Sequence, residues 1–201
     1  MKIKHLFTDR KIYDLTSSYI SSLESKIKKM TRSDFNNSTI EELTEKLRAE
    51  FEISIPELSK DEIYTKQPKD IKITVGRRGV YGGGTTKVDG TEFTFVIPFK
   101  GDSYYFGITP TKFLSVVPYG NAGNNEISIS YEVPNGRDSS GLRAEFDNNL
   151  ATIEKYLDFL DSDFKQFNNQ LASGITTFLE RRKAKLDSDD ETASGFGFPV
   201  K

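Results

Sequence analysis

Apolar residues recur at steps of three or four through residues 10–30, and this spacing predicts a helix with one buried face. A polar stretch at 32–37 ends that helix. Ser38 and Glu41 then have the spacing of a capping box, which predicts the start of a second, shorter helix that Pro56 terminates. The two apolar faces are Ile12, Leu15, Tyr19, Leu23, Ile27 and Met30 in the first helix and Ile40, Leu43, Leu47 and Phe51 in the second.

The period of the pattern changes to two between about residues 69 and 133. Alternating apolar and polar positions predict half-buried strands. The candidates are residues 71–75, 93–97, 113–117 and 127–133. Because no strand is followed by a crossover helix, we expect these strands to form an antiparallel sheet.

The last third returns to a helical spacing that runs from Leu142 to Leu186. A continuous helix over residues 139–186 would be about 70 Å long. Two alternatives remain open: one long coiled-coil arm, or two helices separated near Asn168 or at Gly174. Because the apolar positions of this region include several Phe, unlike a regular coiled coil, we favour antiparallel packing against residues 10–30.

These patterns predict an α+β fold, with an antiparallel sheet of about four strands. N-terminal helices and a long, possibly broken C-terminal helix flank this sheet. The expected segments are helical residues 1–68, a β-sheet region at 69–134, the long helix or helical pair at 135–187 and a flexible tail at 188–201. All four are expected to belong to one cooperative domain.

Composition supports a folded chain and narrows its chemistry. The 201 residues include 28 Lys and Arg, 30 Asp and Glu, 15 Phe and nine Tyr. This aromatic content is unusual for a disordered chain, and the charge balance does not favour an anionic partner. With no Cys and a single His, the sequence offers no thiol nucleophile and no Cys/His zinc site. We therefore predict no cofactor and no metal site, and the residue types argue against an enzyme.

The apolar pattern does not predict a targeting signal. No apolar run near the N-terminus has the length of a signal peptide, and no stretch approaches a membrane span. The expected location is the cytoplasm, with no membrane partner.

The glycine-rich segment 76–87 is the first candidate binding site. Its Arg77, Arg78 and Lys87 could neutralise a phosphate, and Tyr81 could stack on a base. The spacing is not that of a phosphate-binding loop, and a hairpin connection between two strands is the simpler interpretation. A second basic group lies at Arg181 and Arg182, where it would also favour the end of a helix. Nucleic-acid or nucleotide binding through these groups is our alternative function.

Carboxylates and the single histidine are weaker candidates. Two groups of acids lie within short helical spans, namely Asp158, Asp161 and Asp163, and Glu41, Glu42 and Glu45. Either group could be drawn as a cation site or an acid–base pair. A charged helix face is the simpler interpretation of both, and His5 is expected at a surface or strand edge.

Several Phe are concentrated in the C-terminal third. Together they exceed what a small sheet can cover, and exposed apolar stripes usually mark interfaces. We therefore expect a non-enzymatic interaction or assembly module that binds a protein partner or itself. The candidate interface residues are Phe164, Phe167, Phe178, Phe196 and Phe198.

Short motifs between residues 70 and 201 add a resemblance. They are the segment Ile97–Asp102, the prolines 110 and 118, the basic segment 181–186 and the segment 197–201. This pattern resembles bacterial modules of anti-phage defence systems, which can precede an effector such as a TIR or nuclease domain. The resemblance implies a component of such a system, whose effector would be a separate protein or a further domain. It implies no catalytic residue.

Overall fold

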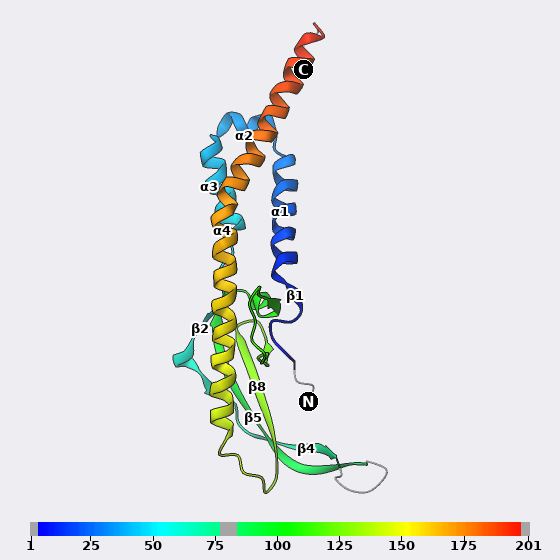
Figure 1. The fold of residues 1–201 in the computed structure, drawn as a ribbon, viewed down its shortest axis with the longest axis vertical. Coiled ribbons are helices and arrows are strands. Elements are labelled where there is room, and N and C mark those ends of the chain that lie inside the picture. Colours follow the sequence, from blue (N-terminus) through cyan, green and yellow to red (C-terminus); the bar gives the residue numbers. More distant parts are fainter. Residues whose placement is uncertain (1–3, 77–83, 198–201) are drawn as a thin grey trace. The chain divides into compact units, whose positions relative to one another are not determined.

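The structure is a computed structural model that describes residues 4–76 and 84–197. The chain divides into two compact units. Unit 1 comprises Met1–Lys11 and Ile55–Leu160, and unit 2 comprises Ile12–Ser54 and Asp161–Lys201. Helix α4 (Leu142–Gly195) is unbroken and contributes its first part to unit 1 and its last part to unit 2 (Figure 1). In the described ranges, no helix has the length and hydropathy needed to cross a membrane.

Unit 1 is built around one long strand, β5 (Thr85–Lys100). One edge of β5 pairs with β8 (Glu126–Pro134), and the other pairs chiefly with β4 (Lys69–Gly76), in both cases antiparallel. The prediction of an antiparallel sheet with flanking helices is confirmed. The shorter elements are β1 (Arg10–Lys11), β2 (Glu57–Leu58), η1 (Lys60–Glu62), β3 (Tyr64–Thr65), η2 (Ser103–Gly107), β6 (Ile108–Thr109) and β7 (Asn121–Ala122). Strands β1 and β6 form a separate parallel pair.

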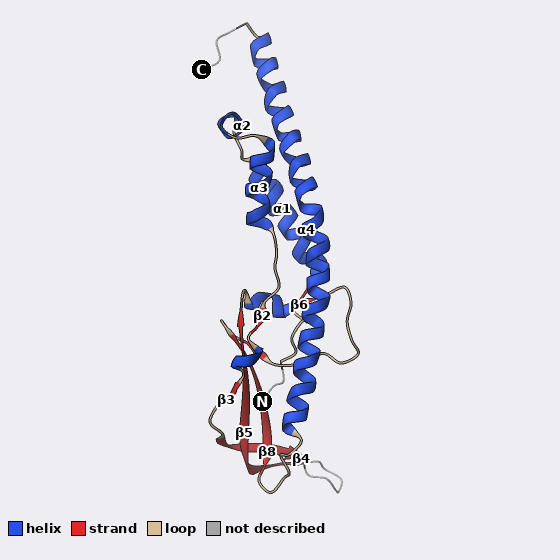
Figure 2. Ribbon diagram, turned by 90° about the vertical axis from the view of Figure 1, so that its left-hand side faces the viewer, coloured by secondary structure: helices blue, strands red, loops and turns tan. Residues whose placement is uncertain are grey.

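The core of unit 1 lies between this sheet and the first part of α4. Figure 2 shows α4 running beside β5 and β8. The Phe95 ring stacks on Phe146 of α4 with 4.5 Å between ring centroids. The apolar positions of the strands supply the rest, and the residues Val96, Ile97, Ile127 and Ile129 are fully buried. Ile127 and Ile129 follow the alternating pattern on one face of β8, whereas Val96 and Ile97 are adjacent and lie on opposite faces of β5, so β5 is buried on both faces at this point.

One expected strand is absent. Residues 113–117 form a loop without strand pairing, and the prediction there was wrong. The physical reason is that the Tyr156 side chain of α4, rather than a neighbouring strand, binds the backbone of this segment, as described below.

Unit 2 is a helical bundle. It contains α1 (Ile12–Lys28), α2 (Arg32–Asn37), α3 (Ile40–Phe51) and the last part of α4. The helical faces predicted for α1 and α3 point into one core with α4. That core consists of Leu23, Ile27, Leu43, Leu47, Leu171, Ile175 and Leu179.

The direction of helix packing corrects a second expectation. Tyr19 of α1 contacts Phe167 of α4, and Met30 just beyond α1 contacts Arg182. Residue numbers rise together along the two helices, so α1 and α4 are parallel rather than antiparallel. It is α3 that runs antiparallel to α4, because Thr44 contacts Thr176 while Ile53, just beyond α3, contacts Asn168.

Helix boundaries also differ from those expected. α4 continues through Gly174 and ends at Gly195, so residues 188–195 are helical rather than a flexible tail. The residue that caps α3 is Thr39, whose hydroxyl accepts from the Glu42 amide at 3.2 Å, one position after the predicted Ser38–Glu41 pair. The polar stretch 32–37 is itself the short helix α2, which begins after Thr31.

Candidate interaction surfaces

Three exposed apolar side chains of unit 1 lie in one loop. Phe113, Leu114 and Val116 are 72%, 38% and 65% exposed. We call residues 113–116 the apolar loop. Single exposed apolar residues are common, but three within four positions concentrate apolar surface on one short segment.

The apolar loop is held by a buried tyrosine. The Tyr156 hydroxyl accepts from the Leu114 amide at 3.3 Å and lies 3.3 Å from the Leu114 carbonyl and 3.5 Å from the Val116 carbonyl, to which it can donate. The Tyr156 side chain is 1% exposed, and its ring stacks on Phe7. The loop is therefore attached to the core of unit 1 although its own side chains face outward.

The buried side chain of Asn149 binds Tyr119, three residues beyond the apolar loop. Asn149 accepts from the Tyr119 amide at 3.1 Å and donates to the Tyr119 carbonyl at 2.7 Å. Asn149 and Tyr156 are seven residues apart on α4, so both lie on the same helix face. Two side chains of one helix thus provide hydrogen bonds that a neighbouring strand would otherwise supply.

A groove between α1 and α4 is the main candidate surface of unit 2. It has a volume of about 280 Å³. We call it the α1/α4 groove, and it is lined by Glu24, Ile27, Lys28, Phe178, Arg181, Arg182 and Lys185. Ile27 and Phe178 are its apolar residues, and four of the other five are cations. The groove therefore suits a segment that presents both an apolar side chain and carboxylates.

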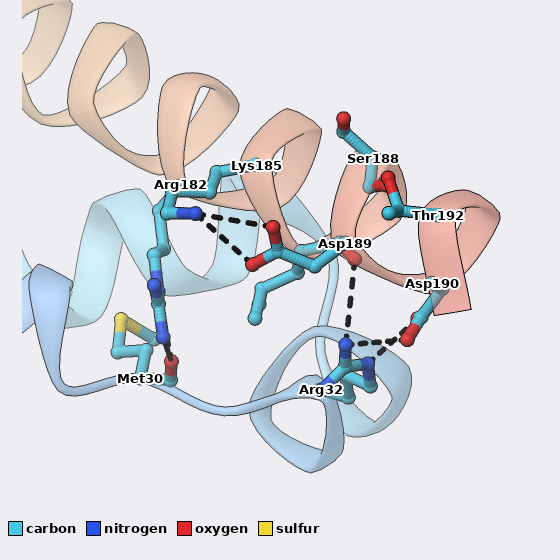
Figure 3. Close-up of polar contacts among 9 residues, drawn as sticks. Met30, Arg32, Arg182, Lys185, Ser188, Asp189, Asp190 and Thr192 are labelled. Carbon is cyan, nitrogen blue, oxygen red and sulfur yellow. Dashed lines mark hydrogen bonds and ion pairs between the residues drawn. The ribbon is translucent and has the colours of Figure 1, made fainter. Parts of the chain in front are cut away.

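Two arginines of unit 2 are engaged in contacts within the chain. Arg182 donates from Nε and Nη2 to the Met30 carbonyl at 3.0 and 2.9 Å, and Arg32 donates from Nε to Asp190 at 2.6 Å (Figure 3). Met30 follows the last turn of α1, where carbonyl groups lack helical partners and a cation is favoured. Arg182 thus connects α4 to the end of α1.

Of the other residues predicted to bind nucleic acid or nucleotide, Arg181 lines the α1/α4 groove together with Arg182. Arg77, Arg78 and Tyr81 lie outside the described residues. Lys87 is exposed on β5, opposite Thr74 of β4, and belongs to unit 1. Arg181 belongs to unit 2. Binding of nucleic acid or nucleotide through these residues stays a prediction.

We find no protein-family model, characterised protein or solved structure that matches this chain.

The predicted interface aromatics have different environments. Phe164 is 1% exposed, so its ring is covered within the chain and is not available as a surface. Phe167 and Phe178 are partly buried against the core of unit 2, while Phe196 is 69% exposed in the turn after α4. Phe198 lies outside the described residues. Much of the expected surplus of aromatic surface is therefore covered by α1 and α3.

Each of the two candidate groups of carboxylates has a member that makes a local contact. Asp161 binds Lys165 at 2.6 Å, and Glu42 accepts from the Thr39 amide at 2.9 Å. Within residues 4–76 and 84–197, no three His, Asp or Glu side chains come together in a way that could hold a metal ion.

His5 lines a small pocket of unit 1, of about 190 Å³, together with Asp9, Arg10 and Tyr104. Arg10 donates to the Tyr104 hydroxyl at 2.9 Å. Asp9 is the one carboxylate among the described residues that line this pocket. The pocket therefore lacks the second carboxylate that a paired acid–base mechanism would use.

Glu126 joins β8 to the segment at β3. Its carboxylate accepts from Lys66 Nζ and from the Tyr64 hydroxyl, both at 3.0 Å. The hydrogen bonds from Lys66 and Tyr64 lower the pKa of Glu126 below its ordinary value. The direction is expected, because both donors stabilise the charged form of the carboxylate.

The sequence pattern did not identify the apolar loop as a candidate surface. The signal was present as a run of apolar residues between Pro110 and Pro118, but such a run also fits a strand. Tyr156 and Asn149 were missed because hydrogen bonds from a helix to a distant loop leave no periodic pattern in the sequence.

Proposed function

We propose that this chain is a non-enzymatic, cytoplasmic interaction module, whose apolar loop inserts into an apolar pocket of a partner protein. The observation that carries this proposal is that a buried tyrosine binds the backbone of a loop whose three apolar side chains are exposed. The proposal differs in its surface from the C-terminal stripe expected from the sequence, because that stripe is largely covered within unit 2.

Burial of the apolar loop would contribute substantially to binding. Covering one large apolar side chain contributes about 1.5–3 kcal/mol when burial is complete. Phe113 is 72% exposed and Val116 is 65% exposed, so each retains most of this contribution for a partner. An aromatic anchor surrounded by smaller apolar contacts is typical of the residues that dominate binding energy.

The hydrogen bonds to Tyr156 also favour binding. Ordering a flexible loop on association opposes binding, and a loop already ordered in the free protein avoids much of that entropy loss. The Leu114 backbone is bound through both its amide and its carbonyl in the free chain. Tyr156 therefore supports the surface without being part of it.

The resemblance to modules of anti-phage defence systems supplies a partner class. In this proposal the apolar loop binds an effector-bearing protein of such a system. The partner chemistry is a pocket lined by apolar side chains, since residues 113–116 carry no charged group.

Site-specific photo-cross-linking in the host tests the proposal. A photoreactive phenylalanine analogue at Phe113 is expected to give a discrete protein adduct, and the same analogue at Tyr13 serves as a control because Tyr13 is 75% exposed but lies in unit 2. With the purified adduct protein, Phe113→Ser is expected to weaken binding by about tenfold or more, consistent with loss of an aromatic anchor. Equal cross-linking at the two positions, or unchanged affinity of the Phe113→Ser variant, would rule the proposal out.

A further inference from the structure

The α1/α4 groove is lined by two apolar residues and by four cations. Among these cations, Lys28 pairs with Glu24 at 3.6 Å and Lys185 pairs with Asp189 at 3.1 Å. No ion pair of Arg181 occurs among the described residues. An occupant of complementary chemistry would bring an aromatic or aliphatic anchor together with a carboxylate.

The last part of α4 has this complementary chemistry. Four acidic residues follow the groove along the helix, namely Asp187, Asp189, Asp190 and Glu191, and of these Asp189 lies on the same helix face as Phe178 and Lys185. Beyond them, Phe196 is 69% exposed. We call residues 187–196 the acidic segment. One chain therefore carries both a basic, apolar groove and a segment that would fit it.

Phe196 cannot reach the groove of its own chain, although Asp189 of the acidic segment already pairs with the groove residue Lys185 one helical turn away. Phe178 and Phe196 are 18 positions apart, and α4 is helical as far as Gly195. At 1.5 Å per residue this places the two positions about 27 Å apart along the helix. The Arg32–Asp190 ion pair also connects the acidic segment to α2 (Figure 3). A second copy of the chain can provide the segment that the groove accommodates.

The spacing of side chains along α4 defines how two copies would pair. The positions of Phe178, Arg182, Lys185, Asp189, Thr192 and Phe196 follow steps of four and three, so these residues share one helix face. This face is self-complementary when two such helices run antiparallel. Phe178 of one copy then lies opposite Phe196 of the other, and Lys185 lies opposite Asp189.

We propose that two copies of this chain associate through antiparallel α4 helices, with the acidic segment of each copy in the α1/α4 groove of the other. Such an arrangement has two-fold symmetry, so every contact occurs twice and the assembly closes as a dimer. This inference concerns unit 2 and is independent of the partner proposed for the apolar loop.

Charge exchange at the paired positions provides the decisive test. In Lys185→Glu both paired positions are acidic, and in Asp189→Lys both are basic, so each variant alone is expected to repel its own copies. A mixture of the two variants is expected to associate, since the two acidic side chains of one copy then face two lysines of the other. Sedimentation velocity of the full chain measures each case, and circular dichroism verifies that both variants keep their helices.

Removal of the aromatic anchor provides a second measurement. Phe196→Ser is expected to raise the dimer dissociation constant by about tenfold or more, because two anchors are lost per dimer. Phe113→Ser is the matched control, since it changes an exposed Phe of unit 1 and should leave the dissociation constant unchanged. A wild-type chain that is monomeric at high micromolar concentration would overturn the inference. So would a dimer that Phe196→Ser and both charge variants leave intact.

Discussion

Replacing Tyr156 by Phe tests whether one hydroxyl orders the apolar loop. The substitution keeps the ring, which stacks on Phe7 with centroids 5.1 Å apart, and removes only the group bound to the loop backbone. The core of unit 1 should therefore remain packed. The change is confined to the bonds with the amide and carbonyl of Leu114 and with the carbonyl of Val116.

The magnitude follows from the geometry of these bonds. They are long, at 3.3–3.5 Å, and Leu114 is 38% exposed, so water can replace the hydroxyl. An intramolecular hydrogen bond makes a net contribution of about 0.5–1.5 kcal/mol to the free energy of unfolding. An amide that water can reach does not pay the full cost of a buried donor without an acceptor. We expect Tyr156→Phe to lower the free energy of unfolding by about 1 kcal/mol and to reduce protection of the Leu114 amide about fivefold.

Hydrogen exchange and chemical denaturation measure the two effects separately. The matched control is Tyr13→Phe, which removes a hydroxyl from a side chain that is 75% exposed and should change neither quantity. The reasoning is refuted if the Leu114 amide keeps its wild-type protection in Tyr156→Phe. A destabilisation above about 3 kcal/mol would refute it as well, since a loss of that size indicates disturbed packing rather than a missing hydroxyl.

Three further predictions concern other parts of the chain. Asn168→Ala removes the side chain that binds both the amide and the carbonyl of Ile53, at 3.1 and 2.8 Å, and should destabilise unit 2 by about 1–3 kcal/mol in denaturant unfolding; an unchanged midpoint would contradict this assignment. Gly174→Ala should stabilise the chain by about 0.5–1 kcal/mol, because an added Cβ has no neighbour within 4 Å and alanine favours the helix; a lower thermal midpoint would show the opposite. Because the folded pKa of Glu126 is lowered from the ordinary 4.5, its contribution to stability is present above about pH 4.5 and is lost as the pH falls through the folded pKa. NMR titration should show this low pKa returning towards 4.5 in Lys66→Met, and a titration that the substitution does not move would count against the assigned cause.

The period of the apolar pattern was sufficient to predict most of the helices and strands. The period-two segments around Ile73, Phe95 and Ile129 became β4, β5 and β8, and the helical faces of residues 10–30 and 40–51 became α1 and α3. Each of these elements buries at least one face, so the apolar spacing records the contact that stabilises it; β5 also buries Val96 on its second face. The pattern works because burial and local geometry have the same period.

Features that depend on contacts between distant residues could not be predicted in this way. The apolar spacing of α1 and α4 shows which faces are buried, but it is the same for parallel and antiparallel neighbours. Parallel packing became visible only through specific contacts such as that between Met30 and Arg182. The apolar spacing also could not show whether the helix continues through Gly174. A helical glycine costs about 1 kcal/mol, which is small beside the free energy gained by burying Leu171 and Ile175 on the same stretch.

The two asparagines of α4 illustrate why polar residues within an apolar helix face carry information. Asn149 and Asn168 each bind the amide and carbonyl of one residue outside the helices, Tyr119 and Ile53 respectively. Asparagine is a poor helix former and its amide is costly to bury without partners. These costs are offset only if the side chain satisfies backbone groups that would otherwise be unpaired. An asparagine that interrupts the apolar stripe of a long helix therefore indicates a neighbouring irregular segment, although the pattern alone does not identify which segment it holds.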